Sequence, residues 1–361
     1  MVSRRLLRYR VKRHYIRSSL LTCFAIYLFA FTQRSLTSRA RKPCVRRRSV
    51  VQGMTSSTRS DEYPPVSGVR VGVLIQVGNW GLWEELATGC VDHVVDSTDT
   101  AFILVSSHVR GKERLVKRRY GCANVITVPN YGADIAPFFT ELWNLGQRIR
   151  DADFIIKLHT KTNDSWRRGM IEPICGTHSA VSRSLETLRS SPTLGILGAT
   201  EYAFFIDSND EIIIENEFAT RYRLNTSFYA IYDRVSNRSQ LDEHFYRNWR
   251  GNTDLESLTD QELLSHFRER GRSERRVFSE SMQNLLESEG YPKFIAGTIF
   301  WFRVAPMADF LNRYRADEIA LTMSSEKGYF RDEHIDRITH AWERCLSILF
   351  HSRGYELAGS S

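Results

Sequence analysis

Two polar residues that directly follow an apolar run could carry catalytic chemistry. His159 and Lys161 come after residues 154–158 (Phe-Ile-Ile-Lys-Leu) and are separated by one threonine. A lysine ammonium is a compact point charge that can stabilise negative charge as it develops in a transition state. The simpler alternative is a surface lysine at a strand end beside a histidine satisfied within the core. The two residues alone leave both interpretations open.

A second polar segment, Pro-Asn-Tyr-Gly-Ala-Asp at residues 129–134, follows another short apolar run. Asp134 stands where a helical pattern begins, so it could cap that helix by accepting hydrogen bonds from free backbone N–H groups. Its carboxylate could equally bind a pyrimidine N–H or a ribose hydroxyl. Gly132 would then allow the backbone to approach a ligand closely, and Asn130 lies in the same segment. One aspartate can serve both roles.

A third group of polar residues lies on the last helical pattern, residues 334–350. Asp336, His340 and Glu343 share one face beside an apolar stripe. A carboxylate or an imidazole there is suited to act as a general base. The alternative is a solvated helix face with pairing between Asp336 and His340. We favour Asp336 as the base, because Glu343 could instead pair with an arginine, Arg303 or Arg344.

The elements that must position these residues alternate between strand and helix. The patterns predict strands over 71–77, 101–105, 125–128, 154–158 and 194–198, and helices over 82–95, 111–120, 134–150 and 182–190. This alternation predicts an α/β fold with a mostly parallel, Rossmann-like sheet and helices on both faces. Ligands of such sheets bind beyond the carboxyl ends of the strands, where the first two polar segments lie. Neither segment carries the glycine-rich dinucleotide fingerprint or a P-loop, which argues against an NAD enzyme or an NTPase.

The remaining patterns are helices near 242–250 and 280–287, a strand over 294–303 and the helix over 334–350. Gly297 interrupts the strand and could mark a bulge or a tight packing contact. The six cysteines contain no C-x-x-C pair, so we expect no zinc site, and their spacing assigns no disulfides.

The charge of the chain is divided unevenly along its length. Residues 1–60 hold fifteen of the 50 Lys and Arg residues and no Asp or Glu, whereas the other 301 residues hold 35 basic and all 42 acidic residues. The body is therefore mildly acidic. This balance argues against a nucleic-acid partner that binds the body by bulk charge.

The basic residues of this terminus flank an uncharged stretch, residues 18–33. As a helix, sixteen residues span about 24 Å, against a hydrocarbon core of roughly 30 Å, and flanking arginines can snorkel to lengthen the span. We expect a short membrane anchor that places the body, residues 61–361, in the lumen of the secretory pathway, such as the Golgi or the ER. The alternatives are a transit peptide for a mitochondrion or plastid and a cleaved secretory signal.

Five blocks occur in order: Asn130-x-Gly-x-Asp134-Ile-Ala-Pro-Phe, Lys157-Leu-His-Thr-Lys161 followed by Trp166, Leu194-Gly195, Ala296-Gly-Thr-Ile-Phe-Trp-x-Arg303, and His340-Ala-x-Glu343-Arg344. Together, over residues 68–353, they resemble the rhamnan synthesis protein F family of bacterial polysaccharide glycosyltransferases. The resemblance implies a GT-A-like fold and transfer of a deoxyhexose, often rhamnose, from a nucleotide sugar to a glycan acceptor, with no further cofactor. It also implies a nucleotide-sugar half (68–200), a variable acceptor side (201–290) and a C-terminal catalytic part (291–353). A non-catalytic glycan-binding or assembly subunit of this fold is the alternative.

The resemblance also suggests roles for the polar residues. In nucleotide-sugar transferases of this topology, an Asp-x-Asp pair after the fourth strand usually binds Mg²⁺ or Mn²⁺. His159 and Lys161 stand at that place. We therefore expect transfer without a metal, with Lys161 stabilising the leaving diphosphate and Asp336 deprotonating the acceptor hydroxyl.

The expected substrate-binding residues surround these catalytic groups: Asn130, Gly132, Asp134, Gly297, Thr298, Trp301, Arg303, His340, Glu343 and Arg344. The backbone at residues 297–298 would border the sugar. Trp301 would offer an apolar face to a deoxysugar methyl group and Arg303 a cation near phosphate. Strand alternation predicts that these two side chains share one face of their strand, opposite Phe300 and Phe302.

Overall fold

The computed structural model of the chain describes residues 66, 68–206, 214–249, 255, 257–271, 276–325 and 337–360. All of them belong to one compact unit, Pro43–Ser361. The predicted anchor, residues 18–33, and the predicted base Asp336 lie outside the described residues. Among the residues that are described, no helix is both long and apolar enough to span a bilayer.

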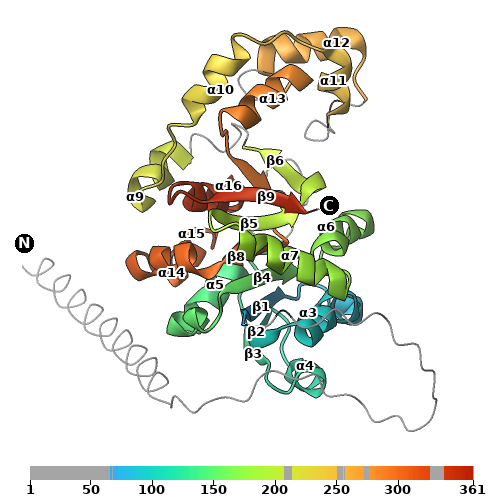
Figure 1. The fold of residues 1–361 in the computed structure, drawn as a ribbon, viewed down its shortest axis with the longest axis vertical. Helices are drawn as coiled ribbons and strands as arrows, with labels where there is room; N and C mark the ends of the chain where they lie inside the picture. Colours follow the sequence, from blue (N-terminus) through green and yellow to red (C-terminus); the bar gives the residue numbers. More distant parts are fainter. Residues whose placement is uncertain are drawn as a thin grey trace, which may run out of the picture. The chain divides into compact units, whose positions relative to one another are not determined.

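A seven-stranded sheet with the order β3-β2-β1-β4-β8-β5-β9 forms the centre of this unit (Figure 1). Its strands are β1 (Arg70–Gln76), β2 (Asp99–Ser107), β3 (Asn124–Thr127), β4 (Phe154–His159), β5 (Leu194–Ala199), β8 (Phe300–Arg303) and β9 (Glu356–Ser360). β1 pairs in parallel with β2 and β4, β2 with β3, and β5 with β9. The predicted mostly parallel sheet is confirmed. The exception is β8, which runs antiparallel between β4 and β5.

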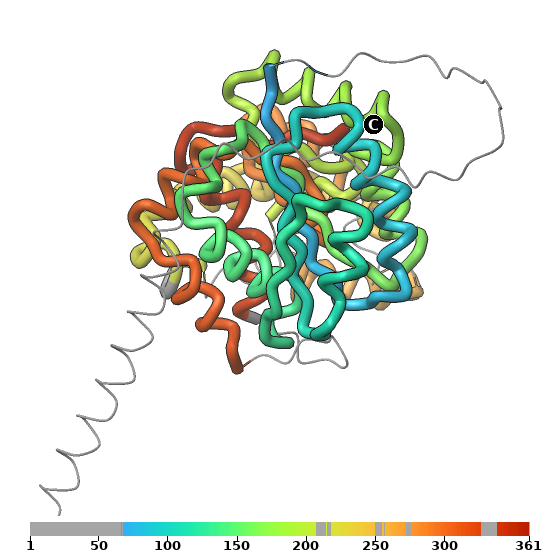
Figure 2. Tube along the Cα trace, turned by 90° about the horizontal axis from the view of Figure 1, so that it is seen from below, coloured from blue at the N-terminus to red at the C-terminus, as the bar shows by residue number. Residues whose placement is uncertain are grey.

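Helices cover both faces of the sheet, as predicted. One apolar core includes side chains of α2 (Trp83–Leu86), α3 (Asp92–Ser97), α4 (Glu113–Arg119), α6 (Asp164–Cys175) and α7 (His178–Ser190). The second core includes side chains of α5 (Ile135–Leu145), α14 (Val304–Arg313), α15 (Ala316–Thr322) and α16 (Arg337–His351). Figure 2 shows the orange and red chain of α14–α16 beside the green α5.

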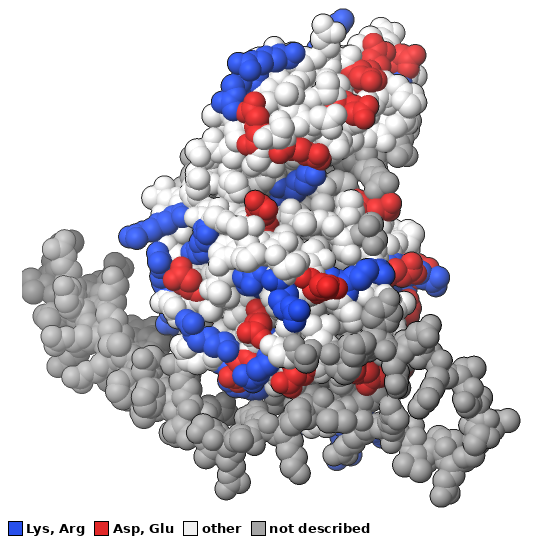
Figure 3. Space-filling model, in the orientation of Figure 1, with Lys and Arg blue, Asp and Glu red and all other residues white. Residues whose placement is uncertain are grey.

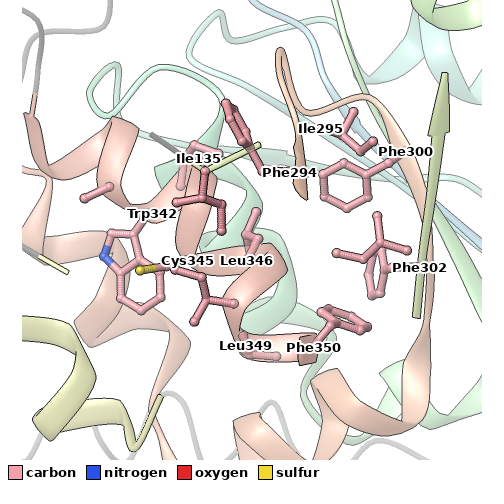
Figure 4. Close-up of a cluster of buried hydrophobic side chains, with 14 of the residues drawn as sticks. Ile135, Phe294, Ile295, Phe300, Phe302, Trp342, Cys345, Leu346, Leu349 and Phe350 are labelled. Carbon is pink, nitrogen blue, oxygen red and sulfur yellow. The ribbon is translucent and has the colours of Figure 1, made fainter. Parts of the chain in front are cut away.

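The C-terminal helix α16 is held by its apolar stripe. Trp342, Leu346 and Phe350 are buried in the same core as Phe300 and Phe302 of β8, and Figure 4 shows these side chains facing one another. The ring centres of Phe302 and Phe350 lie 6.3 Å apart. This packing fixes the helix beside β8, and with it the polar residues on the neighbouring face of α16.

A smaller two-stranded sheet and several helices lie between β5 and β8 in the sequence. β6 (Ala203–Phe205) pairs antiparallel with β7 (Lys293–Ile295). The helices are α9 (Thr220–Tyr222), α10 (Tyr229–Ser236), α11 (Glu243–Asn248), α12 (Asp260–His266) and α13 (Glu280–Ser288). Short 3₁₀ turns cover Trp80–Leu82, Gly146–Asp151 and Thr200–Tyr202, and π-helical turns cover Ala87–Val91, Ile214–Ala219 and Phe267–Gly271. Of the helices between β5 and β8, the sequence predicts α11 and α13, each with approximate ends.

The predicted single strand over 294–303 is wrong. The segment forms the end of β7 in the small sheet and the whole of β8 in the main sheet. Between them Gly297 and Thr298 have φ values of 79° and 53°. Two consecutive residues in the left-handed region turn the chain sharply, so β7 and β8 cannot be continuous.

The unit contains disulfide-bonded cysteines. Cys90 in the π-helical turn is bonded to Cys175 at the end of α6, and Cys122 is also disulfide-bonded.

On the face in Figure 3, acidic and basic side chains of the described residues are interspersed. That face therefore presents no broad region of a single sign.

Candidate functional site

A buried lysine on β4 organises a polar cluster at the carboxyl edge of the sheet. The Lys157 ammonium donates hydrogen bonds to Asp134 Oδ2 (2.5 Å), Thr298 O (3.0 Å) and Thr298 Oγ1 (2.8 Å). An ammonium has three donors, and all three are used. Lys157 therefore ties together the start of α5, the end of β4 and the turn before β8.

Asp134 precedes α5 but does not cap it, because its side chain accepts no hydrogen bond from the helix backbone. Its Oδ2 instead accepts from Lys157 and from the Thr298 hydroxyl. Burial alone would raise the pKa of Asp134, but the charge and hydrogen bond of Lys157 and the hydrogen bond from Thr298 together outweigh burial and hold the pKa well below its ordinary value. Asp134 is therefore ionised at neutral pH and committed to this cluster.

Thr298 is strained. A β-branched residue at a φ of 53° is a conformational outlier that costs on the order of 1–3 kcal/mol. Its carbonyl and hydroxyl are both held by Lys157, and its hydroxyl donates to Asp134. Such strain persists only where the surroundings impose it, and it is concentrated at functional sites.

The peptide groups of Gly297 are held from two sides. His159 donates from Nε2 to Gly297 O at 2.6 Å, and Glu343 of α16 accepts from Gly297 N through Oε1 at 2.7 Å. Burial lowers the pKa of His159 to about 4, with the charges of Lys157 and Lys161 contributing in the same direction. His159 is therefore neutral at neutral pH and positions the turn at residues 297–298. Burial also raises the pKa of Glu343 above its ordinary value.

Lys161 differs from the other charged residues of the cluster. Its Nζ lies 4.3 Å from the centre of the Trp166 ring, a cation–π contact. A Cβ at Gly297 would lie only 3.1 Å from this Nζ, which places the ammonium beside the strained turn. Burial lowers the pKa of Lys161, although Asp134 and Glu343 oppose the shift. Within the described part of the chain, the Lys161 ammonium forms neither a hydrogen bond nor an ion pair.

The backbone around Lys161 is fixed even though its ammonium is not. The buried Arg167 donates to Lys161 O at 2.6 Å and to Glu85 through Nε and Nη2. Thr160 Oγ1 accepts hydrogen bonds from Gly78 N and Asn79 N, each at 2.9 Å, which joins this loop to the end of β1. The cation therefore projects from a loop whose backbone is held by hydrogen bonds.

Two predicted binding residues lie away from this cluster. Alternation along β8 is as predicted, with Phe300 and Phe302 on one face and Trp301 on the other. The fully buried Trp301 faces α6, and its Nε1 donates to Ile174 O at 3.1 Å. Arg303 pairs with Phe154 at the opposite end of β4 and donates to three carbonyls at and beyond the end of α7, those of Leu188, Ser191 and Leu194. Because β8 is antiparallel, its last residue lies at the edge of the sheet opposite Lys161.

The other predicted residues divide between the cluster and its surroundings. Arg344 stacks over the Phe294 ring at 4.6 Å and lies 3.4 Å from Glu343, so Glu343 pairs with Arg344 and not with Arg303. His340 is half-buried on α16, and Asn130 is exposed before α5. Gly132 is required for packing, because a Cβ there would lie 2.6 Å from Ala136 Cβ and 2.9 Å from Met323 Cβ. Its role in the approach of a ligand stays a prediction.

Sequence reasoning does not single out Lys157, Arg167 or Glu141 as site residues. The signal for Lys157 is a lone lysine inside an otherwise apolar strand. Glu141 is a buried carboxyl on the core face of α5, and burial raises its pKa to about 8. Lys157 begins one of the five sequence blocks, but the contacts that define its role and that of Arg167 are long-range, so the block alone does not reveal them.

The described residues contain no group of three or more His, Cys, Asp or Glu side chains arranged to hold a metal ion. No protein-family model matches the sequence. No curated protein matches it either. A solved structure of core-mannan synthase A from Aspergillus fumigatus, in a Mn/GDP form, is similar with a TM-score of 0.32 and 14% identity, over 83% of this chain and 71% of that chain. The likeness is too weak to carry an activity from that protein to this chain.

Proposed function

We propose that this protein is a glycosyltransferase that moves a deoxyhexose of the rhamnose kind from a nucleotide sugar, such as a UDP- or dTDP-sugar, to a glycan acceptor. The observation that carries the proposal is the Lys161 ammonium. It is half-buried at the carboxyl edge of the sheet, stacked on Trp166, and without an ion pair among the described residues. Burial has removed part of its hydration, so an anion at this position would restore the interactions that the ammonium has lost.

The proposed reaction matches that charge. The acceptor hydroxyl oxygen attacks the anomeric carbon, the bond from that carbon to the donor phosphate oxygen breaks, and the nucleoside diphosphate leaves with the bonding electrons. Lys161 stabilises the charge that develops on the diphosphate, and Asp336 takes the hydroxyl proton. The turn at Gly297 and Thr298 lies beside the Lys161 ammonium. This turn is held by hydrogen bonds with Lys157, His159 and Glu343.

Activity is expected to be independent of divalent metals, because in this proposal Lys161 supplies the charge that a cation would otherwise provide. Transfer should be unchanged after incubation with EDTA and gel filtration. Loss of transfer that Mn²⁺ or Mg²⁺ restores would contradict this prediction.

We also propose that the body of the protein lies in the lumen of the secretory pathway. The Cys90–Cys175 disulfide supports this location, because disulfides form and persist in oxidising compartments and are rare in the cytosol. The uncharged segment 18–33 would then be the membrane anchor, as the sequence suggests.

Removal of this disulfide should destabilise the protein substantially. The bonded cysteines are 85 residues apart, and closing so long a loop limits the unfolded chain, so the double variant Cys90→Ala/Cys175→Ala should lose about 2–5 kcal/mol of unfolding free energy. Urea unfolding under non-reducing conditions measures the change. Equal stability of the variant, or thiol labelling of both cysteines in protein from the secretory pathway, would contradict the proposed bond and location.

A further inference from the structure

A pocket separate from the Lys161 cluster opens against the small β6–β7 sheet. Its volume is about 420 Å³, within the range of small-molecule sites, roughly 300–1,000 Å³. Its walls are formed by residues of the 3₁₀ turn Thr200–Tyr202, of β6, β7, α11 and α13, and by the residue after α11. None of the residues predicted from the sequence lies in it.

Aromatic rings form one wall of the pocket. Phe205 and Trp249 are stacked with ring centres 6.5 Å apart, and Phe204 meets Trp249 edge-on at 6.1 Å. Phe204, Phe245 and Trp249 are only half-buried, so part of each ring remains accessible. These rings offer a flat apolar surface, which suits the C–H face of a pyranose ring.

A chain of hydrogen-bonded polar groups also lines the pocket. Trp249 Nε1 donates to Gln283 Oε1 at 3.0 Å, Gln283 Nε2 donates to Glu287 Oε1 at 3.4 Å, and Lys293 Nζ pairs with the same oxygen at 2.7 Å. Glu287 Oε2 accepts no hydrogen bond from another described residue. The wall thus presents acceptors and donors side by side, and hydroxyl groups can satisfy both.

The charge of the lining favours a neutral ligand. Among the described residues that line the pocket, Lys293 is the only Lys or Arg, and it is already paired with Glu287. A phosphate or carboxylate ligand would therefore find no unpaired lysine or arginine among these described lining residues. The apolar rings, the hydrogen-bond acceptors and donors, and the lack of an unpaired Lys or Arg among the described lining residues together fit an uncharged polyhydroxyl compound.

The pocket is connected to the Lys161 cluster through one short segment. Lys293 begins β7, and four residues later the same segment reaches Gly297, about 13 Å away in an extended chain. Ala296 N donates a hydrogen bond to Tyr202 O at 2.9 Å, and the centre of the Tyr202 ring lies 5.1 Å from that of Trp166. Trp166 is the ring that the Lys161 ammonium contacts. A short oligosaccharide could therefore extend from the pocket to the cluster.

We propose that this pocket binds a neutral pyranose unit of the acceptor glycan, away from the bond that is formed. This inference rests on the proposed function, and it specifies the acceptor as an uncharged oligosaccharide held by Trp249 and Glu287.

The test uses the full-length chain and four disaccharide probes, namely α-1,2-mannobiose, cellobiose, lactose and maltose, with binding followed by ligand-observed NMR. At least one probe should bind the wild type. Glu287→Ala should weaken that binding about tenfold or more, since it removes hydrogen bonds to a charged group. The matched control is Glu280→Ala, which removes an exposed glutamate from the same helix outside the pocket and should bind as the wild type does.

The same samples are assayed for release of nucleoside diphosphate from the sugar donors. If no probe binds the wild type, or if Glu287→Ala binds as tightly as Glu280→Ala, the pocket proposal is overturned, whatever the donor assay shows. If a probe binds in the expected way but no donor is turned over, the pocket is a glycan-binding site, and the glycosyltransferase proposal fails together with the acceptor role of the bound glycan.

Discussion

Replacing Lys161 with alanine is expected to lower kcat by about 10²–10³-fold, the usual effect of losing one electrostatic contact to a transition state. The loss should appear mainly in kcat and less in KM, because charge on the leaving diphosphate develops as the bond breaks. Folding should be affected only modestly. The Lys161 ammonium has no hydrogen bond or ion pair within the described residues, so the main loss is its cation–π contact with Trp166, which is worth about 0.5–2 kcal/mol.

Two further variants make this test specific. Lys161→Arg should recover only part of the activity, since it restores the charge in a different shape. Lys117→Ala removes an exposed lysine from α4 and should behave as the wild type does. Melting temperature and turnover are measured for all four proteins. A folded Lys161→Ala protein with nearly normal turnover would contradict the proposal that Lys161 stabilises the leaving diphosphate.

Replacing Lys157 with methionine is expected to destabilise the fold by about 3–5 kcal/mol, because it leaves the Asp134 carboxylate largely buried without its partner. It also releases the hydrogen bonds that hold Thr298 in its strained conformation. Urea unfolding at pH 7 measures the loss. The double variant Lys157→Met/Asp134→Asn should be more stable than Lys157→Met alone, because no unpaired charge remains buried.

The pH dependence of this loss has a definite sign. In the wild type the lowered pKa of Asp134 adds stability above its ordinary value, near 3.9, and that stability disappears on acidification. Without Lys157, burial would favour the protonated carboxyl, so the variant gains relative stability as Asp134 is protonated. The difference between the two proteins should therefore shrink on acidification, first above about pH 4, where Asp134 of the variant is protonated, and further below about pH 4, where the wild type loses the contribution of the ion pair. A difference that is constant from pH 7 to pH 3 would contradict the role given to this ion pair.

The sequence predicts the first half of the sheet well because its signals are local. Buried runs such as that of β1 alternate with helical patterns, and both follow from the spacing of apolar residues along the chain. The direction of β8 depends on long-range pairing with β4 and β5, which periodicity does not contain. Without that direction, Arg303 could not be assigned to the correct edge of the sheet.

The same distinction applies to the site. Asp134 follows β3 and His159 ends β4, and the carboxyl ends of both strands lie at the same edge of the sheet. The rule that ligands of parallel sheets bind at this edge therefore identifies both residues. Lys157 joins residues 23 and 141 positions away in the sequence, and Glu343 reaches Gly297 only because α16 packs beside β8. Contacts of this kind are set by tertiary packing, and no local pattern encodes them.

The most direct test of the proposed function is nucleoside diphosphate release by the purified full-length protein, screened over UDP-, dTDP- and GDP-sugars with oligosaccharide acceptors. We expect release from one class of donor, dependent on an acceptor, retained in EDTA and reduced about 10²–10³-fold in Lys161→Ala. Folded wild-type protein that binds oligosaccharides but releases no diphosphate from any donor would contradict the proposal and would identify a non-catalytic glycan-binding protein.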